Sequence, residues 1–91
     1  MPKVKTPLRR AAGKLTSAIQ KEWDDELGTD DAEESENVMH RSHDFIQAKG
    51  VEDVVELLGG RNVSEYLGEE WVQRHPKVVS FIEALEQELK K

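Results

Sequence analysis

The chain contains no cysteine, few aromatic residues and no long apolar run. Without cysteine it forms neither disulfides nor thiolate metal sites, and it has no thiol nucleophile. Crossing a bilayer takes about 20 apolar residues, and the sequence contains neither such a run nor the apolar core of a signal peptide. We therefore expect a cytoplasmic protein that does not insert into membranes.

Catalytic and cofactor-binding motifs are also missing. Serine, histidine and aspartate occur without a nucleophile elbow or a glycine-rich phosphate loop to position them. The acidic stretch 24–34 lacks the alternating oxygen ligands and the central glycine of a calcium loop. A chain of 91 residues also has little room for a pocket that excludes water. We expect a protein that is not an enzyme, needs no cofactor and has no small-molecule substrate.

The charges that are present are segregated along the chain, whose net charge is −6. Residues 1–21 contain bases and no acid, whereas residues 22–36 contain acids and no base. The bases, called the basic set below, are Lys3, Lys5, Arg9, Arg10, Lys14 and Lys21. The acids predicted to contact a partner, called the acidic set, are Asp24, Asp25, Asp30, Asp31, Glu33 and Glu34.

Hydrophobic periodicity predicts an all-α protein of four to five helices. Residues 1–6 are expected to form a flexible basic arm, and residues 7–91 a single helical domain. Apolar residues then recur at intervals of three and four: Leu8, Ala12, Leu15, Ile19 and Trp23. This pattern predicts a helix over about 8–27, with Pro7 as its first residue and Gly28 just after its end.

The charge order predicts that this helix breaks at Gly28. Bases near the N-terminus and acids near the C-terminus both oppose the helix dipole, whereas the same acids are favourable in the first turn of a new helix. We therefore expect a second helix over about 31–49, capped by Thr29 or Asp30 and ended by Gly50. The two helices would pair as an antiparallel hairpin.

The second half predicts three shorter helices, over about 51–58, 63–74 and 76–90. In the first, Val51, Val54, Val55 and Leu58 have the spacing of one buried face. The second opens with a capping box, in which Asn62 and Glu65 satisfy each other's backbone N–H groups. Pro76 is suited to the first position of the last helix.

These features favour a protein-interaction or regulatory module that acts through its first helix. An amphipathic helix with opposed basic and acidic segments can pair with a partner of complementary charge. We expect that partner to be a second copy of the chain, with the basic set of one copy meeting the acidic set of the other, or another protein.

Two alternatives remain open. The basic arm and helix edge could contact nucleic-acid phosphates, although the adjacent acids would repel a polyanion. The spacing of 51–58 and 63–74 also fits a helix–turn–helix, but the second helix displays more acid than base. Separately, Glu36, His40 and His43 share one helix face and could bind a divalent ion, whereas a polar outer face is the simpler interpretation.

Overall fold

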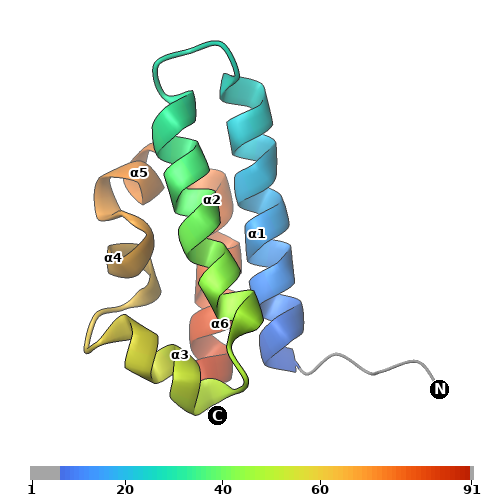
Figure 1. Cartoon of the computed structure of the whole chain (residues 1–91), viewed down its shortest axis with the longest axis vertical. Helices are drawn as coiled ribbons and strands as arrows, with labels where there is room; N and C mark the ends of the chain where they lie inside the picture. Colours follow the sequence, from blue (N-terminus) through green and yellow to red (C-terminus); the bar gives the residue numbers. More distant parts are fainter. Residues whose placement is uncertain (1–6, 91) are drawn as a thin grey trace, which may run out of the picture.

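A computed structural model describes residues 7–90, and every regular element in that range is a helix (Figure 1). The elements are α1 (Pro7–Glu26), α2 (Ala32–Gln47), α3 (Val51–Leu58), α4 (Val63–Leu67), α5 (Glu69–Arg74), the short 3-10 helix η1 (Pro76–Val78) and α6 (Val79–Lys90). The all-α class and the N-terminal hairpin are therefore confirmed. The predicted basic arm, including Lys3 and Lys5, lies outside the described residues.

The core lies where α1, α2 and α6 meet. The two hairpin helices run side by side, α6 lies behind them, and the short helices α3 to α5 lie on the side of α2 away from α1 (Figure 1). The predicted apolar stripe of α1 is buried from Leu8 to Ile19, whereas Trp23 at its end is half-buried. One buried polar contact joins α1 to α2: the Thr16 hydroxyl donates to Ser42 Oγ at 3.1 Å.

The predicted break at Gly28 is confirmed, and the structure corrects how the chain turns there. Gly28 has φ +89°, a conformation that favours glycine. The Thr29 hydroxyl donates to the carbonyl oxygen of Glu26 at 2.6 Å, so it completes the end of α1 instead of capping α2. The N-cap of α2 is Asp31, not Thr29 or Asp30, and its side chain makes no capping hydrogen bond.

The ends of α2 and α3 also differ from expectation. Helix α2 ends at Gln47, two residues early, and the backbone N–H of Lys49 donates instead to the Asp53 carboxylate at 2.9 Å. In α3, Val54 and Leu58 are buried as predicted, but Val51 and Val55 are 37% and 53% exposed. The four residues span about 100° of the helix circumference, and only the side of that arc that carries Val54 and Leu58 faces the core.

The helix predicted over 63–74 is in fact two helices. The capping box of Asn62 and Glu65 is present and opens α4, but Gly68 has φ +133° and redirects the chain into α5. Arg41 of α2 donates to the carbonyl oxygen of Leu67 at 2.7 Å, which satisfies one group freed by the break. The helix–turn–helix interpretation is therefore wrong, because it needs a continuous recognition helix.

The single tyrosine, Tyr66, joins α4 to α2 and gives a prediction for alkaline pH. Its hydroxyl donates to Asp44 Oδ2 at 2.7 Å, and burial, followed by this hydrogen bond, raises the pKa of Tyr66 above its usual value of about 10. The unfolded chain then loses the phenolic proton first, so stability present below about pH 10 is lost as pH rises further. Tyrosinate absorbance should titrate later in folded than in denatured protein.

The matched variant for this prediction is Tyr66→Phe. Above about pH 10, its free energy of unfolding should fall less steeply with pH than that of wild-type protein, because it has no phenol to titrate. Denaturant unfolding of both proteins at several alkaline pH values separates this effect from lysine titration, which both share. Equal tyrosinate midpoints in folded and denatured wild-type protein would contradict the prediction.

Candidate functional site: a basic groove along the first helix

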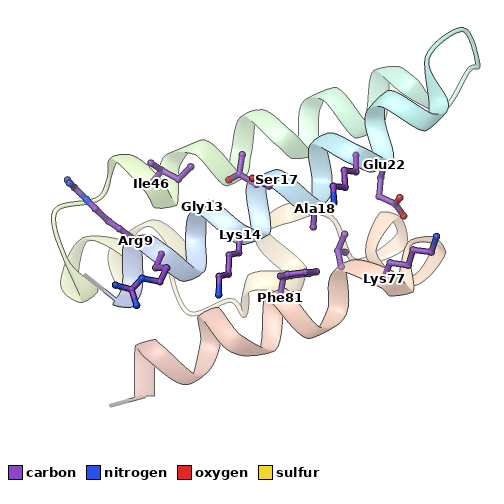
Figure 2. A pocket seen from close by; sticks show the side chains of 13 residues that line it. Arg9, Gly13, Lys14, Ser17, Ala18, Glu22, Ile46, Lys77 and Phe81 are labelled. Atoms are coloured by element: carbon purple, nitrogen blue, oxygen red, sulfur yellow. The ribbon is translucent and has the colours of Figure 1, made fainter. Parts of the chain in front are cut away.

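The outer face of α1 is the floor of an open groove of about 890 Å³ between α2 and α6 (Figure 2). Figure 2 shows Lys14 and Phe81 on the α6 side of α1, and Ile46 on the α2 side. A Cβ atom at Gly13 would have no neighbour within 4 Å, so the middle of the floor is bare backbone. The lining residues are Arg9, Arg10, Gly13, Lys14, Thr16, Ser17, Ala18, Lys21, Glu22, Ile46, Lys77, Val78 and Phe81.

The groove combines positive charge with apolar surface. Its bases are Arg9, Arg10, Lys14, Lys21 and Lys77, and Glu22 is its only acid, in a chain whose net charge is −6. Ala18, Ile46 and Phe81, which are partly exposed, supply apolar surface between these bases. Such a groove can pair with carboxylates and remove an apolar side chain from water at the same time.

The groove brings together the part of the basic set that lies in the described residues. Arg9, Arg10, Lys14 and Lys21 all line it, and the helical spacing of Arg10, Lys14 and Lys21 predicts that these three share one edge. Lys77 was missed, because only the packing of η1 and α6 against α1 brings it to this face. No periodicity within 76–90 indicates which helix Lys77 approaches.

The acidic set, in contrast, divides between two environments. Asp24, Asp25, Asp30 and Glu33 are exposed around the turn between α1 and α2. Asp31 and Glu34 instead face Arg74 of α5: Asp31 Oδ1 lies 3.9 Å from Arg74 Nη1, and Glu34 accepts a hydrogen bond from Arg74 Nη2. That hydrogen bond raises the pKa of Arg74, so this guanidinium stays charged. Within the first group, Asp24 accepts an exposed hydrogen bond from Gln20 Nε2 at 3.2 Å.

Glu26, within the same acidic stretch, turns inward and forms a polar network. Its Oε1 accepts a hydrogen bond from Ser35 Oγ at 2.9 Å and lies 2.7 Å from His75 Nε2. Ser35 Oγ in turn accepts from Trp71 Nε1 at 2.8 Å. These four residues, called the Glu26 network, connect the end of α1, the start of α2 and the end of α5.

The hydrogen bonds of His75 fix where protons lie in the Glu26 network. Its Nδ1 is 2.7 Å from the Trp71 carbonyl oxygen, which can only accept, so Nδ1 carries a hydrogen. Its Nε2 faces Glu26 Oε1, and this contact also needs a proton between its two atoms. The imidazole ring stacks on the Trp71 indole with centroids 4.1 Å apart.

Serine, histidine and glutamate thus meet, but not as a catalytic triad. A triad needs the serine hydroxyl bonded to the histidine, whereas Ser35 donates to the carboxylate of Glu26. Ser35 is also fully buried, out of reach of a substrate. The Glu26 network is therefore a structural connection between helices.

The histidine-rich face of α2 brings fewer ligands together than a metal ion requires. His40 Nε2 lies 3.9 Å from Glu36 Oε1, and both side chains are largely exposed. Across residues 7–90, no three histidine or acidic side chains converge as they would around an ion. The groove is therefore the candidate functional site.

Comparison with models of protein families, with curated proteins and with solved structures finds no match to this chain. None of the helices described between Pro7 and Lys90 has the length and apolar character needed to span a bilayer.

Proposed function

We propose that the protein is an interaction module that binds an acidic protein segment in the groove along α1, and that a second copy of the chain is its first partner. The observation that supports this is the pairing of five bases with an apolar floor in one groove of an acidic protein. A segment with carboxylates around an apolar side chain would satisfy both features. A regulatory role would follow from occupancy of the groove.

Salt-dependent self-association tests this proposal. Raising the ionic strength from about 0.01 to 1 M shortens the Debye length from about 30 to about 3 Å, so association through exposed charges should weaken. We expect light scattering to give a mass above the 10.4 kDa of one chain at low salt, falling towards it at high salt. The mass of a single chain throughout would contradict the proposal.

Paired charge reversals test whether the groove is responsible. Lys14→Glu with Lys21→Glu should abolish association at low salt, because both bases line the groove. Lys49→Glu with Lys90→Glu is the matched control, since it changes the net charge equally at two exposed lysines outside the groove. Equal loss in both variants would show that net charge, and not the groove, controls association.

A nucleic-acid partner is the second candidate, and the five bases of the groove favour it. Against it, a phosphate backbone would leave the apolar floor uncovered, and Asp24 and Asp25 follow closely along α1. Fluorescence anisotropy with labelled duplex DNA and RNA at about 50 mM salt decides the question. Binding that disappears on changing Arg9, Arg10 and Lys14 to glutamate would support this candidate, and undetectable binding by wild-type protein would exclude it.

A further inference from the structure

The segment that enters the groove can be specified further. We infer that it is the turn between α1 and α2 of a second copy, with the side chain of Leu27 placed on the apolar floor. This inference rests on the proposed function, because it names the occupant of the same groove. The turn connects the two longest helices and projects beyond the other elements at one end of the bundle (Figure 1).

Leu27 is the most exposed large apolar side chain in the described part of the protein. It is 60% exposed, although the core of the same protein buries leucine almost completely at Leu15 and Leu67. Residues 7–90 leave more than half of Leu27 uncovered, so this apolar surface remains in water unless a partner removes it. A projecting turn that begins with an exposed leucine can enter a groove.

The charges around Leu27 match those around the groove. Asp24, Asp25 and Asp30 are exposed on either side of Leu27 in the sequence. On the groove, Lys14, Lys21 and Lys77 stand beside Ala18, Val78 and Phe81. Leucine on the apolar floor would therefore bring carboxylates to the bases at the rim, and both features of the groove would be used by one segment.

Both surfaces lie on one helix, which determines the symmetry of the pair. The middle of the groove and Leu27 are separated by about 12 residues of α1, or about 18 Å at 1.5 Å per residue. If two copies place their α1 helices antiparallel, the turn of each lies over the groove of the other. Two identical contacts then form around a two-fold axis, and assembly stops at a dimer.

The alternative occupant on this protein is α3. Val55 is 53% exposed and lies beside Glu52 and Glu56, so α3 also presents an apolar side chain among acids. Its valine is shorter than leucine and lies on the flank of a helix packed against α6, whereas Leu27 lies on a projecting turn. The turn therefore fits the groove better, and Val55 provides a matched comparison.

The first test removes one apolar side chain at a time. By burying less apolar surface, Leu27→Ser should raise the dimer dissociation constant about tenfold or more, and Val55→Ser should change it less than about twofold. Sedimentation at low salt measures both, and circular dichroism shows whether each variant remains helical. A larger loss in Val55→Ser than in Leu27→Ser would assign the groove to α3 and overturn the inference.

The second test exchanges the charges of groove and turn. Lys14→Glu with Lys21→Glu gives one variant, and Asp24→Lys with Asp25→Lys gives the other. The groove of the first variant then holds three bases and three acids, and in the second variant lysines replace two of the three aspartates that flank Leu27. Alone, each variant has lost the attraction between turn and groove and should be monomeric. Mixed, the acidic turn of the first meets the basic groove of the second, and the lysines in the turn of the second meet the glutamates introduced into the groove of the first.

We expect the mixture to form a one-to-one dimer, although both variants keep a net negative charge. One result would overturn the inference and leave the proposed function standing. In it, wild-type protein dimerises and the groove variant does not, but the turn variant still dimerises. Mixing the two variants would then form no additional dimer. If wild-type protein is monomeric at low salt, the proposed self-association itself fails.

Discussion

We expect the Trp71→Ala variant to lose about 3–5 kcal/mol of unfolding free energy, the cost typical of deleting a fully buried aromatic side chain. Trp71 is 1% exposed, and its removal also leaves Ser35 without the indole N–H and His75 without its stacking partner. The free energy of unfolding of a native protein is about 5–15 kcal/mol in total, so this loss would bring the protein close to unfolding at room temperature. Urea unfolding followed by circular dichroism measures it.

The matched control is the same substitution at the other tryptophan. Trp23 is only half-buried at the end of the α1 stripe, so Trp23→Ala removes less packing and should destabilise less than Trp71→Ala. Equal losses at the two positions would contradict the burial on which this prediction depends.

The second large effect is expected at Ser35. Its hydroxyl accepts from the Trp71 indole and donates to Glu26, so Ser35→Ala leaves a buried N–H without a partner. Leaving such a group unsatisfied costs about 1–3 kcal/mol, and the better helix propensity of alanine offsets only a few tenths of a kcal/mol. Thermal and urea unfolding should both show the loss.

Ser80→Ala is the control for Ser35→Ala, because Ser80 is exposed near the start of α6. It should change stability by less than about 0.5 kcal/mol. Combining Ser35→Ala with Trp71→Phe adds a further check. With the indole N–H already absent, the serine substitution should cost less than it does alone, and simple additivity would show that the hydrogen bond contributes little.

Sequence patterns located the long helices well, because each long helix carries several apolar residues at helical spacing and a glycine or proline near its end. The break at Gly28 followed from the charge order, and the capping box at Asn62 followed from two residues three apart. Gly68 was missed as a break because a glycine inside a helical pattern does not by itself end a helix. Its effect depends on packing, since Arg41 supports the interrupted backbone from α2.

The candidate site was only partly predictable for a related reason. Because the face of a helix on which a residue lies follows from its spacing, Arg10, Lys14 and Lys21 could be assigned to one surface from the sequence. Ile46 of α2, Lys77 of η1 and Phe81 of α6 also line the groove, and their approach to α1 is a long-range property. Likewise, the acidic run did not show that Glu26 turns inward, because the hydrogen bonds that hold it come from Ser35 and His75.

The separation of the acidic turn from the basic groove has a kinetic consequence. It gives the molecule an electric dipole moment, so a charged partner is rotated into a preferred orientation before any surfaces touch. For two copies that each carry a net charge of −6, net charge alone would make the encounter rate rise with ionic strength, whereas attraction between the turn and the groove makes it fall. At a physiological Debye length of about 8 Å, this orientation acts only in the last stage of approach.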